Sequence, residues 1–272
     1  MRSILLHARD DDAFDVRLQV ALDLVRAFDG HLTCLQAVSL DFAMSWDVDG
    51  ILSAEMAQVV RERAEAFRAK LQVRLAAEDV RWEWDDRIGL GDSVLQEFAA
   101  LSDVVVVGAG APKNAAAPSW LAGALVIHAR VPVLAVPEGC PGLRCDAPAL
   151  VCWNGSVESS RALRAAVPLL ALAESVTLAT VGDGETQGEE VDLPPVQGAE
   201  YLARHGIDCE IVRLPWTTRK EVPGQLREAA RARNAGLVVM GAYGHSRMLE
   251  TLLGGVTRDM LSNPPAPLLM AN

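Results

Sequence analysis

The chain alternates short β-branched segments with longer segments of helical periodicity, and it does so twice. Five strands are expected in the first half, at 4–7, 31–37, 80–84, 103–107 and 131–136. Five more are expected in the second half, at 149–153, 175–181, 207–214, 236–240 and 266–270. Between them, apolar residues recur at three- and four-residue spacing, for example over 16–28, 55–75, 159–172 and 223–233. Strands that alternate with helices predict an α/β fold, in which helices cover both faces of a parallel sheet.

Glycines repeat at matching positions in the two halves. Gly91 lies 17 positions before Gly108, and Gly224 lies 17 positions before Gly241, in each case across a helix and a strand. Both of these strands end in Gly-Ala, and each half closes with a strand that follows a proline. Shared spacings of this kind indicate a duplicated unit, because each copy needs its turns at the same distances.

A turn-rich segment separates the two copies, since residues 139–148 contain two glycines, two prolines and two cysteines. We therefore predict domains at 1–138 and 149–272, with 139–148 as the linker between them. The alternative is a single doubly wound domain of ten strands, which would not require the shared spacings.

The charge balance argues against a nucleic-acid-binding surface. The chain of 272 residues has 25 basic and 36 acidic residues, for a formal net charge of −11, whereas binding a phosphate backbone needs clustered Lys and Arg. One small anionic ligand remains possible, because the free N–H groups at the start of a helix can bind phosphate without a basic surface. No apolar run approaches the roughly 18 residues of a membrane span, and the first residues do not read as a signal peptide.

The five cysteines indicate a reducing compartment, since their number is odd and none forms a C-x-x-C pair. Cys140 and Cys145 lie close in sequence, and two reduced thiols are favoured there over a zinc site or a disulfide. The acidic run Asp10-Asp11-Asp12 is interpreted as the solvated start of a helix rather than a metal site. We expect a cytoplasmic protein with no metal bound by its side chains alone.

The segment 238–260 carries the chemistry. A buried strand runs into Gly241, and Gly244 follows at the strand's carboxyl end, where open α/β sheets place their ligands. A second glycine turn, Gly254-Gly255-Val256-Thr257, then opens a helix whose first N–H groups would point at an anion. The segment contains neither the G-x-x-x-x-G-K-[ST] phosphate loop nor the G-x-G-x-x-G dinucleotide fingerprint.

Gly241-x2-Gly244-x9-Gly254 resembles the ATP-binding signature of the universal stress proteins, G-x2-G-x9-G-[S/T] at the end of strand four. The order of elements and the closing proline-led strand match as well, so the resemblance covers both halves. It implies two doubly wound five-stranded domains of strand order 3-2-1-4-5, related by a pseudo-twofold axis, with strands 131–136 and 266–270 at their sheet edges. Exposed apolar edges invite pairing, so we expect these two strands to pair antiparallel within the chain.

The resemblance also implies a nucleotide site in the second half. Asn154 stands where the family has an aspartate, and its amide could meet an adenine or ribose edge; alternatively, Asn154-Gly155 is simply a turn pair. Gly255 replaces the family's Ser or Thr, although the Thr257 hydroxyl remains. His245, with its neighbours Ser246 and Arg247, could meet phosphates or form a solvated helix entrance. The expected nucleotide-binding residues are Asn154, Met240, Gly241, Gly244, His245, Gly254, Gly255, Val256 and Thr257.

The first half departs further from the signature. After Gly108 the second glycine is missing from its place, and Pro112 removes an N–H donor. Ala8 or Arg9 stands where Asn154 would be, and Leu125 or a neighbour where Thr257 would be. We predict that this half binds no nucleotide.

The resemblance implies a stress-response protein that binds ATP, ADP or AMP, with Mg²⁺ as a possible companion of the nucleotide. The sequence offers no clear general base or nucleophile beside the glycine turns, so any hydrolysis or autophosphorylation should be slow, and a regulatory role is favoured. The alternatives are a nucleotide-independent interaction or scaffold protein, a slow ATPase or autokinase, and an ATP-using transferase. Expected partners are the nucleotide and the chain's own second domain, with a homodimer possible, and neither nucleic acid nor membrane.

Overall fold

The computed structural model describes residues 1–38, 51–110, 120–182, 193–215, 218, 220–242 and 255–272. The N-terminal half comprises β1 (Ser3–His7), α1 (Phe14–Phe28), β2 (His31–Val38), α2 (Ile51–Ala76), β3 (Arg81–Ile88), α3 (Gly91–Ala99), β4 (Val104–Gly108), α4 (Trp120–His128) and β5 (Val133–Val136). The C-terminal half comprises β6 (Ala149–Cys152), α5 (Val157–Leu170), β7 (Val176–Val181), α6 (Pro195–Arg204), β8 (Cys209–Leu214), α7 (Val222–Ala232), β9 (Leu237–Gly241), α8 (Gly255–Ser262) and β10 (Leu268–Ala271). All ten expected strands are confirmed.

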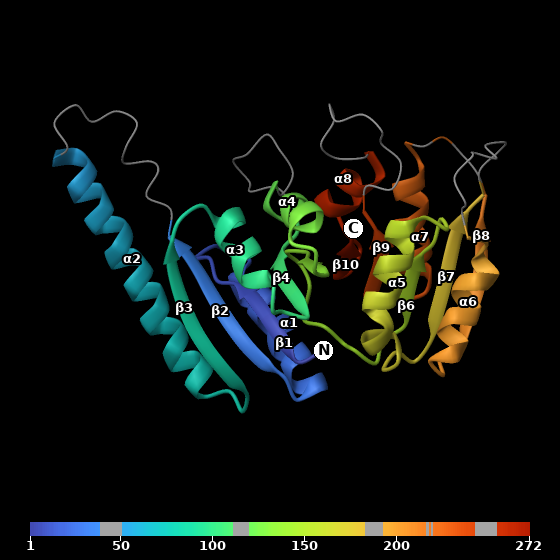
Figure 1. Cartoon of the computed structure of the whole chain (residues 1–272), viewed down its shortest axis with the longest axis horizontal. Helices are drawn as coiled ribbons and strands as arrows, with labels where there is room; N and C mark the ends of the chain where they lie inside the picture. The colour runs from blue at the N-terminus through green and yellow to red at the C-terminus, as the bar shows by residue number, and fades with distance from the viewer. Residues whose placement is uncertain (39–50, 111–119, 183–192, 216–217, 219, 243–254) are drawn as a thin grey trace.

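The strands form one sheet in the order β3-β2-β1-β4-β5-β10-β9-β6-β7-β8 (Figure 1). Each half therefore has the strand order 3-2-1-4-5, and the strands within each half run parallel. The halves meet where β10 pairs antiparallel with β5, with Leu269 opposite Leu134. An antiparallel pair has a local twofold axis, and the same strand order runs outward on either side of it. The halves are thus pseudo-twofold related, with the edge pairing expected from the sequence.

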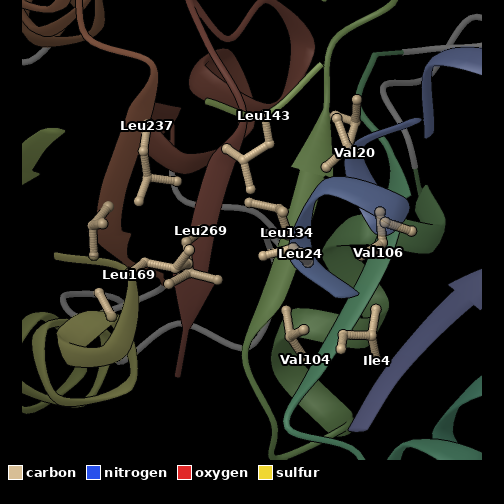
Figure 2. Close-up of a cluster of buried hydrophobic side chains, with 14 of the residues drawn as sticks. Ile4, Val20, Leu24, Val104, Val106, Leu134, Leu143, Leu169, Leu237 and Leu269 are labelled. Atoms are coloured by element: carbon tan, nitrogen blue, oxygen red, sulfur yellow. The ribbon is translucent and has the colours of Figure 1, made fainter. Parts of the chain in front are cut away.

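The interior strands are apolar throughout because helices cover both faces of the sheet. All four valines of β4 are fully buried. One hydrophobic cluster joins the sheet to α1, α2 and α5, and the other joins it to α3, α4, α7 and α8. Both clusters contain residues from both halves, so the core continues across the β5–β10 junction. Figure 2 shows part of this continuous core, with Leu134 and Leu269 near Leu24.

The linker between the halves packs against the hydrophobic core. Leu143 is 4% exposed and belongs to the core cluster that crosses the junction (Figure 2). Its N–H donates to the Asp23 carboxylate of α1 at 2.8 Å, and the Gly236 N–H donates to the Pro148 carbonyl at 2.8 Å. All five cysteines are free thiols, Cys140 among them. Across the part of the chain that is described, no helix combines the length and the apolar character needed to cross a membrane.

Candidate functional site

The strand ends of the C-terminal half bring two loops together. β6 and β9 are neighbours in the sheet, with Cys152 opposite Met240, so the chain leaves both strands at the same edge. After β6 it turns through 153–156 into α5. Of the residues expected to bind nucleotide, Asn154, Met240, Gly241, Gly255, Val256 and Thr257 are described, while Gly244, His245 and Gly254 lie outside the described residues, as do Ser246 and Arg247.

The turn after β6 is built by short polar side chains. The Ser156 N–H donates to the Asn154 amide oxygen at 3.3 Å, and Gly155 has a φ of +79°. The Ser156 hydroxyl then caps α5 by accepting the Ser159 N–H at 3.1 Å. Asn154 therefore does form the turn that its pairing with glycine suggests. The turn uses the amide oxygen, and the exposed Asn154 side chain also carries two N–H donors.

Gly241 is required by the close approach of α5 to β9. A Cβ added at this position would overlap the Ser159 amide nitrogen and lie 2.8 Å from the Ser159 Cα. Backbone atoms cannot move aside without shifting the helix, so any side chain here would displace the first turn of α5. We expected this glycine to let the backbone approach a ligand closely, and in the structure the backbone that it lets approach is that of α5.

Helix α8 begins at an exposed residue. Gly255 is exposed, and a Cβ on it would meet no described atom within 4 Å. The N–H groups of a helix's first turn have no acceptor within the helix, so those of Gly255, Val256 and Thr257 have no partner inside α8. Thr257 is 5% exposed, so the exposed part of this turn is its start at Gly255.

The equivalent place in the N-terminal half is filled by Arg17. A Cβ added at Gly108, at the end of β4, would lie 3.2 Å from the Arg17 Nη1. The Arg17 side chain is 3% exposed and donates to both Asp11 carboxylate oxygens, at 2.8 and 3.0 Å, and to the Arg9 carbonyl at 3.2 Å. An ion pair between the buried Arg17 and the partly exposed Asp11 thus stands at these strand ends. Asp11 belongs to the run interpreted as a solvated helix start, and its carboxylate accepts both the Ala13 N–H at the start of α1 and the Arg17 guanidinium.

Arg17 was not among the expected site residues, although its place in the sequence indicated a special role. Arg17 lies among the buried positions of α1, next to Leu18 and three residues after Phe14. A charged residue on the apolar face of a helix needs a partner when it is buried, and acidic residues lie nearby in sequence, in the run 10–12 and at Asp15. His7, at the end of β1, is buried beside them. Burial and the positive charges of Arg17 and Arg9 lower its pKa to about 3, so it is neutral at pH 7.

The described residues line two clefts, one beside the turn after β6 and one between the two halves. One of about 420 Å³ adjoins the Asn154 turn and is lined by Gly155, Val157, Ser160, Arg161, Arg164 and Leu193. Its two arginines, Arg161 and Arg164, were not among the expected site residues. Two basic residues three positions apart on a predicted helix of an acidic chain were the signal that could have identified them. The other, of about 670 Å³, lies between the halves, away from the β6 and β9 strand ends, and is lined largely by the linker and by 262–267.

The thiol nearest the C-terminal strand ends, that of Cys152, is protonated and therefore a poor nucleophile. Burial raises the pKa of Cys152, the last residue of β6, to about 12, so it carries no thiolate at neutral pH. Within the described ranges, no three His, Cys, Asp or Glu side chains come together as a metal-binding group. The described site therefore offers hydroxyl, amide and backbone N–H groups, which bind ligands by hydrogen bonds.

Residues 148–272 match the model of the universal stress protein family. Among solved structures, a universal stress protein from Archaeoglobus fulgidus is similar over 99% of this chain and 96% of its own, with a TM-score of 0.73 and 15% identity. A functionally unknown protein from Pseudomonas aeruginosa covers 100% and 92%, with a TM-score of 0.62 and 15% identity. A protein from the same species described as a universal stress protein covers 100% and 93%, with a TM-score of 0.59 and 15% identity. A comparison with curated sequences finds no match.

Proposed function

We propose, from the premise that residues 148–272 form a universal stress protein domain, that this domain binds ATP or a related adenine nucleotide at the ends of β6 and β9. The N-terminal half, which shares the fold, binds none. The nucleotide acts as a regulatory ligand in a stress response, in the reducing environment of the cytoplasm that five free thiols favour.

One observation carries this proposal: the two halves differ in the turn that follows their first strand. In the N-terminal half, Asp11 in that turn is paired with the buried Arg17, which stands against the end of β4. In the C-terminal half, the first turn of α8 is open at Gly255, and Asn154 is exposed after β6. Phosphate groups would accept from the N–H groups of that turn, assisted by the helix dipole, while the Asn154 amide would bind the adenine or ribose edge.

The proposed role is binding rather than rapid turnover. The groups that this proposal assigns to the ligand in the described part are the Asn154 amide and the backbone N–H groups of α8, and the nearby Cys152 thiol is protonated; none of these is a ready general base. A Mg²⁺ ion would arrive with the nucleotide, since Mg²⁺ commonly binds through phosphate oxygens and water with few protein ligands. Of the expected binding residues, Asn154 is the exposed one whose side-chain oxygen the described site could add.

A charge placed at the open turn tests the proposal by calorimetry with ATP and Mg²⁺. We expect the wild-type chain to bind one nucleotide. Gly255→Asp should bind at least ten-fold more weakly, because the new carboxylate would repel phosphate, while its position at a helix start favours folding. Gly255 is a cleaner position than Gly241, where any side chain would displace α5.

Gly224→Asp is the matched control, because Gly224 lies in the first turn of α7 and a Cβ there also meets no described atom within 4 Å. It should bind like the wild type. Two equivalent sites per chain, or unchanged affinity in Gly255→Asp, would contradict the proposed site. Failure of the wild type to bind any adenine nucleotide would favour a nucleotide-independent interaction protein instead.

A further inference from the structure

Helix α8 carries the proposed phosphate-binding turn at one end and a contact with the other half at its opposite end. It has eight residues, from Gly255 to Ser262, and is therefore about 12 Å long. The carbonyl of Leu261 accepts the N–H of Gly110 at 2.9 Å. Gly110 follows β4 in the N-terminal half, so this hydrogen bond crosses between the halves.

The same end of α8 is buried in the core that the two halves share. Met260 and Leu261 are almost fully buried, in the cluster that also contains Val107 and Leu125. Helices α4 and α8 contact each other at the junction, where Figure 1 shows them side by side. Within its own half, α8 has a more exposed anchor, in which Arg227 of α7 donates to Asp259 at 3.1 Å.

A helix of this length depends on its surroundings for its order. Isolated helices shorter than about 12 residues are marginal in water, so the docked end of α8 determines how well its first turn is formed. That first turn must be ordered to hold phosphate. Ordering it before the ligand arrives removes an entropic penalty from binding.

We propose that the N-terminal half regulates the nucleotide site through the docking of α8 on Gly110. This inference rests on the proposed function, and it gives the half without a site of its own a role in the other half's affinity. Coupling of this kind is reciprocal, so nucleotide binding tightens the contact between the halves. The cleft of about 670 Å³ is lined by Gly110 and Ser262, and it gives solvent molecules access to this contact.

Two glycine substitutions isolate the contact. Gly110 has a φ of +90° and Gly206, in the loop after α6, has a φ of +74°. A Cβ at Gly110 would come no closer than 3.9 Å to a described atom, and one at Gly206 would meet none within 4 Å. Alanine is strained at both positions by its backbone alone, so Gly110→Ala and Gly206→Ala are matched, and only the first disturbs α8.

The first measurement is hydrogen exchange of the full chain without nucleotide, followed by mass spectrometry. We expect peptides covering α8 to exchange faster in Gly110→Ala and to match the wild type in Gly206→Ala. Equal exchange of α8 in all three proteins would overturn the proposed docking, whether or not the protein binds nucleotide.

The second measurement is ATP affinity by calorimetry. Gly110→Ala should bind at least about five-fold more weakly, the lower end of measured allosteric coupling, whereas Gly206→Ala should bind like the wild type. Faster exchange of α8 with unchanged ATP affinity would overturn the regulatory inference and leave the nucleotide site standing. A wild type that binds no ATP would overturn the proposed function, and the regulatory inference with it, while the exchange result would still decide whether α8 is docked.

Discussion

Gly108 and Gly241 occupy the same position in the two halves, yet different neighbours constrain them. Beside Gly241 stands the backbone of α5, which cannot move alone, and beside Gly108 stands the side chain of Arg17. The matching positions of these two glycines could be predicted from the sequence, because each ends a strand and follows another glycine by 17 positions. The groups that they face could not be predicted from the sequence, since these depend on how closely α1 and α5, distant in the chain, approach the sheet.

The buried His7 makes the protein's stability depend on pH. Its pKa is about 3 in the folded chain, lowered first by burial and then by Arg17 and Arg9, against about 6.5 when unfolded. A lowered histidine pKa contributes stability above the unfolded value, and that contribution is lost as the pH falls from 6.5 toward 3. At pH 4.5 the loss is about 2.7 kcal/mol, two pKa units at about 1.36 kcal/mol each.

Urea unfolding of wild type and His7→Gln at pH 7.5 and 4.5 checks this. Between these two values, the wild type should lose about 2.7 kcal/mol more of its free energy of unfolding than the variant does. The exposed His128→Gln serves as the control and should follow the wild type. Parallel losses in wild type and His7→Gln would show that His7 does not govern the acid sensitivity.

At the scale of elements, strands were the easiest to predict because parallel interior strands are continuous apolar runs. The largest difference is β3, which continues to Ile88, four residues past its expected end at Trp84. Residues 85–87 are all charged and lie beyond the expected strand. An edge strand exposes most of its side chains, so its polar end carries no sequence signal that separates it from a turn.

The linker likewise differs from what its composition suggests. Glycine, proline and cysteine over 139–148 indicated a tether, whereas Leu143 is buried and its N–H is bound by Asp23. We expect Leu143→Ala to lower the free energy of unfolding by about 2–5 kcal/mol, the range for truncating a buried leucine to alanine. Leu101→Ala, at an exposed position, should leave it within about 0.5 kcal/mol of wild type. Similar values for the two variants would indicate a loosely held linker.

For the whole molecule, the junction of β5 and β10 was predictable from two apolar edge strands tethered in one chain. The sharing of both hydrophobic clusters between the halves was not predictable, because it depends on how the paired sheets align their helices. The separate domains inferred from the repeat are therefore joined by a continuous core.

This continuity predicts cooperative unfolding. Wild type should unfold in a single transition in urea, with far-ultraviolet circular dichroism and tryptophan fluorescence coinciding. Leu269→Lys places a charge opposite Leu134 in the core, and it should lower the free energy of unfolding by at least about 3 kcal/mol. Two separated transitions in wild type would show that the halves are energetically independent.

The antiparallel pairing of β5 with β10 also has an evolutionary consequence. In a dimer of identical chains, every substitution is inherited by both subunits at once, so a change that closes one site closes the other. Here the paired halves are encoded separately, and Arg17 could be fixed beside Gly108 with no counterpart beside Gly241. Drift in one half is limited by what the other half needs from it, which includes the surface around Leu134 and Leu269 and, in the N-terminal half, the Gly110 contact with α8.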